Sequence, residues 1–117
     1  MTVTEAAEAI KGTVVACTGQ AAAREVRGGY ASDLLSDVMA NSCEGDLWIT
    51  LQKHVNTVAV AQLNGHAAIV LVNGRKPEPE TMTRAEEEGI PIVSTELPTF
   101  DVVGILYSLG IRGRRSA

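Results

Sequence analysis

The stretch that most constrains the fold is residues 67–72, where six apolar residues (Ala-Ala-Ile-Val-Leu-Val) follow one another without a polar interruption. A strand that is apolar at every position is covered on both faces, which is typical of a parallel sheet in an α/β protein. The turn-forming residues 73–77 come next, and the helix-forming residues 80–88 then end at Gly89. This pattern predicts a buried strand joined to a crossover helix.

The same order of strand and helix is expected on either side of this unit. Residues 46–51 and 90–95 are β-rich runs, and each is followed by a helical pattern. Three such units predict an α/β fold with three layers, α/β/α, and a mainly parallel sheet built from consecutive βα units with right-handed crossovers. The expected helix signals are Asn56 as cap and Asn64-Gly65 as stop for the first helix, and Thr99 as cap, Gly110 as stop and an apolar stripe of Val102, Val103, Ile105, Leu106 and Leu109 for the last.

The N-terminal third is less regular. A short helix capped by Thr4 and ended by Gly12 is expected to precede a strand at 13–17. The remaining expectations are a turn at 18–20, a strand near 24–26, a glycine-rich segment at 28–33 and a helix at 34–39 capped by Ser32 or Asp33. Paired glycines such as Gly28-Gly29 permit positive φ or let another backbone or a ligand approach closely.

With 117 residues, the chain is expected to be a single domain comprising an N-terminal helix (1–12), a core (13–110) and a basic tail (111–117). Aromatic residues make up only 3%, so Val, Ile, Leu and Ala have to build the core. No apolar run approaches the roughly 20 residues that a membrane-spanning helix needs. The first residues also lack the pattern of a secretory signal. We therefore expect a cytoplasmic protein without membrane contact.

The charge is unevenly distributed, although the formal net charge is only −4. Arg112, Arg114 and Arg115 lie in the last six residues, and without them seven basic residues face fourteen acidic ones, which leaves −7 for the body. An acidic body with few aromatics argues against nucleic acid as a partner. The tail is expected to be a short solvated terminus, with contact to an acidic partner as the alternative.

Polar residues gather where the predicted strands end. In an open parallel sheet the ligand crevice lies beyond the carboxyl ends of the strands, where helix N-terminal amides favour an anion. Arg75 and Lys76 add positive charge there, beside a glycine that leaves room for a ligand. The alternative is a plain turn with solvated cations. The residues expected to line the crevice are Asp33, Thr50, Gln52, His54, Asn73, Gly74, Arg75, Ser94 and Thr95.

Signatures of catalysis are missing from the sequence. It contains no phosphate-binding loop, no dinucleotide-binding glycine pattern and no nucleophile elbow. Cys17 and Cys43 fit no metal or redox spacing and are expected to be reduced thiols, and His66 is expected to lie in a plain loop. The chain is thus predicted not to be an enzyme, with no catalytic residues, no metal and no cofactor. The alternative is a small enzyme that uses His54 with Asp33 or Asp37.

Residues 71–80, 85–95 and 28–39 together resemble the DRTGG domain, which is found in some phosphotransacetylases and in pyrophosphatases with CBS domains. Stand-alone members are related to the N-terminal domain of HPr kinase. The resemblance covers about residues 13–110, but Val72-Asn73-Gly74 stands where the family motif has Thr-Gly-Gly, and His54-Val55-Asn56 replaces its Asp-Arg pair. The resemblance implies a regulatory or assembly module without catalysis.

These observations lead to one expected function and one alternative. The expected function is that of a non-catalytic regulatory domain that binds a small anionic metabolite or nucleotide at the carboxyl ends of its parallel strands and forms a homodimer. The alternative is a homodimeric protein-interaction module without a small ligand, for which another protein would be the partner.

Overall fold

A computed structural model describes residues 1–114, so the predicted contribution of Arg115 to a basic tail lies outside the described residues. The strands are β1 (Thr13–Ala16), β2 (Gly28–Ala31), β3 (Asp46–Thr50), β4 (Ala68–Leu71) and β5 (Ile92–Ser94). The helices are α1 (Val3–Ala9), α2 (Thr18–Ala23), α3 (Leu35–Asn41), α4 (Asn56–Asn64), α5 (Pro79–Glu88) and α6 (Thr99–Ser108). None of these helices has the length and apolarity to cross a membrane.

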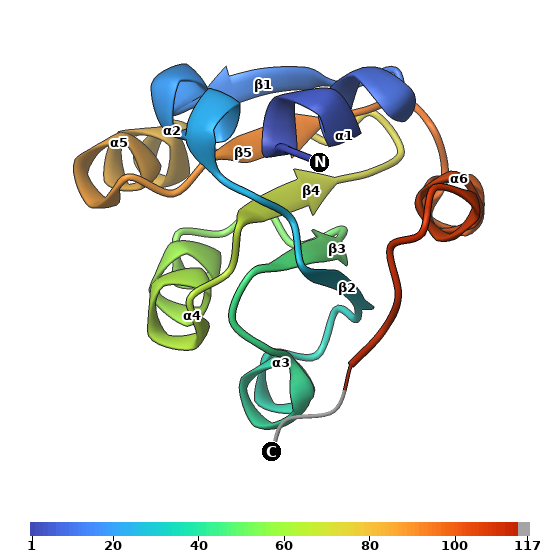
Figure 1. The fold of residues 1–117 in the computed structure, drawn as a ribbon. Helices are drawn as coiled ribbons and strands as arrows, with labels where there is room; N and C mark the ends of the chain where they lie inside the picture. Colours follow the sequence, from blue (N-terminus) through green and yellow to red (C-terminus); the bar gives the residue numbers. More distant parts are fainter. Residues whose placement is uncertain (115–117) are drawn as a thin grey trace.

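All five described strands belong to one sheet in the order β1-β5-β4-β3-β2 (Figure 1). Strands β2 to β5 run parallel, and only β1 pairs antiparallel with its neighbour β5. Ile49, Val70 and Val93 form one row across the three central strands. The predicted mainly parallel sheet is confirmed, and its topology places the carboxyl ends of four strands along one edge.

Helices cover both faces of the sheet and confirm the three-layer architecture. Alternate residues of β4 point to opposite sides, so that Ala68 and Val70 join a core with α1 and α6, whereas Ile69 and Leu71 join a second core with α3, α4 and α5. All four side chains are no more than 1% exposed. The apolar run at 67–72 therefore exists because this strand has helices on both faces.

The crossover helices α4 and α5 end where the sequence indicates. Gly65 follows α4 and Gly89 follows α5, each as the C-terminal cap with a φ of 69°. Glycine is favoured at such a left-handed cap because it has no Cβ to clash with the backbone. These stop signals are thus confirmed, and they fix where the chain turns back into β4 and β5.

The N-terminal third differs from the prediction in three places. The first helix begins after Thr2, which forms a capping box with Glu5, so Thr4 is not its cap. Residues 18–20 begin helix α2 and do not form a turn. The expected strand near 24–26 is wrong, since residue 25 forms only an isolated bridge to Thr2 and the strand is β2 at 28–31.

The paired glycines lie in β2, and the first of them has no room for a side chain. A Cβ at Gly28 would lie 2.8 Å from Asp46 Oδ1 and 2.8 Å from the carbonyl oxygen of Arg112. A close neighbour within the same chain therefore explains this glycine, without any need for a ligand.

The C-terminal segment was predicted to be a solvated tail, and for Arg112 and Arg114 this is wrong. Arg114 Nη2 donates to Asp46 Oδ1 at 2.7 Å, and Asp46 is fully buried. The Arg112 guanidinium lies 3.7 Å above the Tyr107 ring, while its carbonyl accepts from Gly29 N. The segment thereby covers the outer edge of β2, which would otherwise expose unpaired backbone groups.

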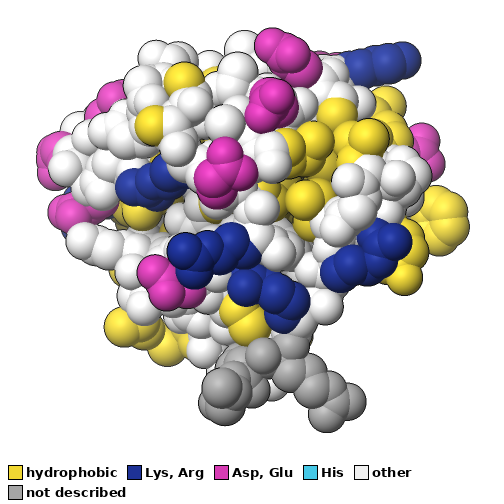
Figure 2. Space-filling view, viewed as in Figure 1, with side chains coloured by type: hydrophobic (Ala, Val, Ile, Leu, Met, Phe, Trp, Pro, Cys, Tyr) yellow, Lys and Arg dark blue, Asp and Glu magenta, His cyan; other side chains and the backbone are white. Residues whose placement is uncertain are grey.

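The predicted apolar stripe on α6 is only partly buried. Val102 and Leu106 are at most 2% exposed, whereas Val103 is 37% and Leu109 is 50% exposed. The outer side of α6 also carries Phe100, which is 88% exposed. Apolar side chains gather between α1 and α6 on the face shown in Figure 2. This helix therefore presents an apolar surface that the described chain does not cover.

Candidate functional site

The topology brings the loops that carry the predicted site residues to one edge of the sheet, called here the carboxyl edge. Asp33 follows β2, Thr50 to His54 end and follow β3, Asn73 to Arg75 follow β4, and Ser94 and Thr95 end and follow β5. Most of these residues bond to one another or to the backbone in two separate groups.

The first group joins the loops after β2 and β3. Asp33 Oδ1 accepts from Thr50 Oγ1 at 2.7 Å and from Leu51 N at 2.7 Å. Gln52 Nε2 donates to the carbonyl of Asp33 at 3.0 Å. Asp33 was expected to cap the next helix, but the N-cap of α3 is Leu34, whose amide donates to Ser32 Oγ. The carboxylate of Asp33 thus joins the loops after β2 and β3 through hydrogen bonds.

The second group joins the loops after β4 and β5. Ser94 Oγ donates to the carbonyl of Arg75 at 2.7 Å, and Lys76 Nζ donates to Ser94 Oγ at 3.3 Å. The Gly74 amide donates to the carbonyl of Thr95 at 2.9 Å, and Thr95 Oγ1 donates to the carbonyl of Ile10 at 2.8 Å. The buried hydroxyls of Ser94 and Thr95 hold the loops in place, and the guanidinium of Arg75 remains exposed.

Gly74 has a structural reason to be glycine. It follows Asn73 in the left-handed region, with φ of 56° for Asn73 and 70° for Gly74. A Cβ on Gly74 would overlap the carboxylate of Glu96. The room that its missing side chain leaves is taken by this neighbouring carboxylate.

The proposed acid–base residues engage different partners. His54 is exposed, and its Nδ1 lies 3.9 Å from Glu78 Oε1. Asp37 accepts from Tyr30 Oη at 2.7 Å and from Asn41 Nδ2 at 2.9 Å. The bond from Tyr30 holds the pKa of Asp37 below its usual value, and the same bond raises the pKa of Tyr30. Asp33 and Asp37 therefore do not form a carboxylate pair around one proton.

Metal-binding chemistry has no visible basis in the described part of the chain. Residues 1–114 contain no group of three or more His, Cys, Asp or Glu side chains that could hold a metal ion. Both cysteines are free; Cys17 is buried and Cys43 is partly buried. The thiol of Cys17 donates to the carbonyl of Ala85 at 3.2 Å, and burial raises its pKa.

The carboxyl edge combines helix N-termini with basic side chains, beside the carboxylates of Glu78 and Glu96 in the same loops. Helices α4, α5 and α6 begin there, and in none of the three does the N-cap side chain accept a hydrogen bond from the first amides of the helix. The predicted caps Asn56 and Thr99 are wrong, since they are the first residues of their helices and Val55 and Pro98 precede them as caps. Uncapped N-terminal amides carry partial positive charge, which favours an anion. The exposed Arg75 and Lys76 add two full charges.

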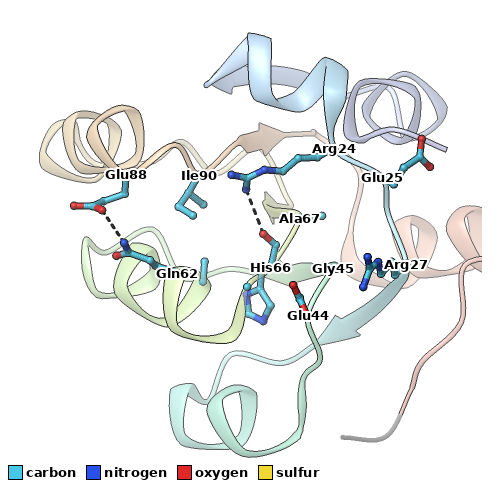
Figure 3. Close-up of a pocket in the computed structure, with 12 residues that line it drawn as sticks. Arg24, Glu25, Arg27, Glu44, Gly45, Gln62, His66, Ala67, Glu88 and Ile90 are labelled. Carbon is cyan, nitrogen blue, oxygen red and sulfur yellow. Dashed lines mark hydrogen bonds between the residues drawn. The ribbon is translucent and has the colours of Figure 1, made fainter.

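A cleft that the sequence did not predict lies at the opposite edge, called here the amino edge (Figure 3). Its volume is about 410 Å³. Its walls come from residues 24–27, 44–45, 61–67 and 88–90, which are far apart in the sequence. The sequence contains no motif for this cleft, because only the order of the strands in the sheet brings its lining residues together.

His66, expected to be an ordinary loop residue, is a buried histidine at this edge. Its Nε2 lies 2.8 Å from Ser42 Oγ, and that hydroxyl donates to the carbonyl of Val38. Nε2 is therefore the protonated nitrogen, and Nδ1 has no hydrogen-bond partner among the described residues. Burial lowers the pKa of His66 to about 4, so its ring is neutral at pH 7. In Figure 3, the His66 ring points away from Arg24, whose guanidinium meets the His66 carbonyl.

The comparisons with known proteins identify the domain. No curated protein matches the chain. Among solved structures, the CBS and DRTGG domains of the regulatory region of Clostridium perfringens pyrophosphatase, complexed with the activator diadenosine tetraphosphate, are similar with a TM-score of 0.67 and 11% identity. The similarity covers 90% of this chain and 45% of that one, so this chain spans less than half of its length. The DRTGG domain profile matches residues 5–109, and the chain therefore belongs to the DRTGG domain family.

Proposed function

We propose that this protein is a non-catalytic regulatory domain whose ligand is a small anionic metabolite or nucleotide. The ligand would bind at the carboxyl edge, near the turn that carries Arg75. The observation that carries the proposal is the convergence of three helix N-termini without side-chain caps on the edge where Arg75 and Lys76 are exposed. Such an arrangement offers an anion both amide donors and full positive charges.

The fastened loops support the proposal, because a preorganised site loses less entropy on binding. Asp33, Ser94 and Thr95 hold neighbouring loops by hydrogen bonds of 2.7 to 2.8 Å. Their proposed role, like that of Gly74, is thus to position the edge, whereas Arg75, Gln52, His54 and Asn73 would face the ligand. The related DRTGG-containing region of the clostridial pyrophosphatase is regulatory and has a nucleotide activator, which makes a nucleotide the first ligand to test.

A regulatory role also fits the state of the two histidines. His54 is exposed beside Glu78, and His66 is buried with a pKa of about 4. His66 contacts the Ser42 hydroxyl, but that hydroxyl is buried and donates to the carbonyl of Val38, so the histidine does not act as its base. This arrangement supports binding over catalysis as the proposed activity.

Thermal unfolding with added ATP, AMP, diadenosine tetraphosphate or acetyl phosphate tests the proposal. A ligand at about 100 times its dissociation constant stabilises the domain by about 2.7 kcal/mol. Arg75→Ala is expected to weaken binding by about tenfold, because a charge-assisted bond is lost. Arg84→Ala on α5, which removes an equally exposed arginine paired with Glu87, is the matched control and leaves affinity unchanged. Absence of stabilisation by all four compounds would contradict the proposal.

The alternative, a homodimeric protein-interaction module, has its own supporting observation. Phe100, Val103 and Tyr107 are exposed at helical spacing on α6, and Gly104 lies among them, where an added Cβ would meet nothing within 4 Å. A glycine inside a helix costs about 1 kcal/mol relative to alanine, and no neighbour in the described chain requires it. Close approach of α6 from a second copy would supply the reason.

Sedimentation at several protein concentrations tests this alternative. The wild type is expected to form a dimer that Gly104→Arg disrupts, because the long side chain separates the two helices. Glu87→Arg on α5 introduces the same side chain on the opposite face of the sheet and is expected to leave the dimer intact. A wild-type protein that stays monomeric at every concentration would exclude the alternative.

A further inference from the structure

The amino-edge cleft is an open hollow of a size that small ligands occupy. Its volume of about 410 Å³ falls in the range of roughly 300 to 1,000 Å³ that is usual for ligand pockets. Three backbone hydrogen bonds join its walls: Arg27 N to Gly45 O at 2.9 Å, Gly45 N to Gly65 O at 2.8 Å, and Ala67 N to Asp46 O at 2.8 Å. The walls are thus linked to each other through the backbone and do not depend on one loop.

Two glycines place a cation and an anion at this cleft. Gly45 has a φ of 85°, and a Cβ there would lie 2.7 Å from Arg27 Cδ. Gly65 has a φ of 69°, and a Cβ there would lie 3.0 Å from Glu44 Cγ. The stems of Arg27 and Glu44 therefore rest on the two glycines, which holds both charged groups beside the opening (Figure 3).

These charges have no partner of opposite sign within the described chain. Arg24, Arg27 and Glu44 form no side-chain ion pair among residues 1–114, although all three line one cleft. Arg24 makes one long hydrogen bond of 3.5 Å to the carbonyl of His66. Basic and acidic side chains also lie side by side across the middle of the face shown in Figure 2. Groups of both signs thus remain available to a ligand.

The helices add negative potential at the same place. Helices α2, α4 and α5 all end at the cleft, with Arg24, Gly65 and Gly89 as their C-terminal caps. The carboxyl end of a helix carries partial negative charge and favours a cation. A purely anionic ligand would meet this potential, and a purely cationic one would meet the two arginines.

From this geometry we infer that the amino-edge cleft is a binding site for a small zwitterion, a molecule that carries an amino group together with a carboxylate or phosphate. The acidic group binds to the guanidinium of Arg27, with Arg24 on the other side of the cleft. The amino group lies near Glu44 and the carbonyl end of α4. This site is separate from the anion site proposed at the carboxyl edge.

Amide chemical-shift titration with phosphoethanolamine tests the inference, with ethanolamine and inorganic phosphate as probes that each carry one of its charged groups. Phosphoethanolamine is expected to give saturable shifts at Arg27, Gly45, Gly65 and His66, with an affinity at least about tenfold higher than either single-charge probe. Equal affinity for phosphate and phosphoethanolamine would overturn the inference, and so would the absence of saturable shifts at these amides up to about 50 mM phosphoethanolamine.

Charge-removing variants make the test specific. Arg27→Gln and Glu44→Gln change exposed side chains and are each expected to weaken phosphoethanolamine binding by about fivefold to tenfold. The matched controls are Arg84→Gln and Glu80→Gln, which remove exposed charges outside the cleft and are expected to have no effect. Loss of binding in the controls alone would overturn the site assignment. Failure of this titration would leave the test of the carboxyl edge unaffected, because that test depends on the Arg75→Ala variant and this one on amide shifts at the amino edge.

Discussion

The two edges of this sheet differ in the sign of the partial charge at their helix ends and in the kind of hydrogen bond that joins their loops. At the carboxyl edge, three helices begin without side-chain caps, and Arg75 and Lys76 are exposed. At the amino edge, three helices end around a cleft that contains unpaired charges of both signs. The loops of the carboxyl edge are fastened by side-chain hydrogen bonds, whereas backbone bonds join the walls of the amino-edge cleft.

This contrast separates the electrostatic potential of an edge from the position of an open cleft. The direction of parallel strands determines which helix ends, and hence which potential, lie at each edge. It does not determine where an open cavity forms, because that depends on which side chains fill the space. In this domain the carboxyl edge and the amino-edge cleft lie on opposite sides, and the predictions below probe each side.

The largest expected effect concerns the buried carboxylate at the amino edge. Arg114→Ala removes the partner of Asp46, which is fully buried, and is expected to destabilise the domain by about 3 kcal/mol. Arg84→Ala removes one member of an exposed pair and is expected to cost less than about 0.5 kcal/mol. Urea unfolding measures both. If the double variant Asp46→Asn/Arg114→Ala is no more stable than Arg114→Ala alone, the unpaired Asp46 carboxylate is not the cause of the destabilisation.

The second prediction uses the buried imidazole at the same edge. The pKa of His66 is about 4 in the folded protein, against 6.5 for the free side chain, so the unfolded chain binds more protons below pH 6.5. The stability contributed by this group is therefore complete above pH 6.5 and decreases as the pH falls toward 4, by about 1.5 kcal/mol between pH 6.5 and 5. Denaturant unfolding at the two pH values measures it.

The two histidines of the chain control for each other in this experiment. A His54→Gln variant is expected to retain the decrease in stability, and a His66→Gln variant is expected to lose it. Retention of the decrease in His66→Gln would show that another group causes it.

The third prediction, of similar size, concerns the carboxyl edge. Asp33→Ala removes the acceptor for Thr50 Oγ1 and Leu51 N and is expected to destabilise the domain by about 1–2 kcal/mol. Asp33→Asn keeps an acceptor oxygen and should cost less. Amide hydrogen exchange should show faster opening of the loops after β2 and β3 in Asp33→Ala. Unchanged exchange there would mean that these bonds do not fasten the edge.

Much of the fold was predictable because its signals are local. A few neighbouring residues are enough to predict strand β4 from its apolar run and the ends of α4 and α5 from their glycines. Strand β2 was missed because glycine disfavours strands, and the need for Gly28 comes from Asp46 and Arg112, which are distant in sequence. Arg114 was misjudged for the same reason, since its partner lies 68 residues away.

The candidate sites were likewise predictable only where their signals are local. Strand direction predicted that Thr50, Asn73 and Ser94 lie at one edge, because each belongs to the end of a predicted strand, whereas Asp33 follows β2, which was not predicted. It did not predict that Asp33 and Ser94 form hydrogen bonds to neighbouring loops, because such bonds depend on side-chain positions to within a few tenths of an ångström. The amino-edge cleft had no sequence signal, because Arg27, Glu44 and Gly65 come from three separate segments.

The central claim is that the carboxyl edge binds an anion, and amide chemical-shift mapping with diadenosine tetraphosphate tests it most directly. The account predicts saturable shifts at residues 73–76 and at the first turns of α4 and α5, all weakened by Arg75→Ala. Saturable shifts confined to the amino edge, or no saturable shift at any described residue, would contradict it.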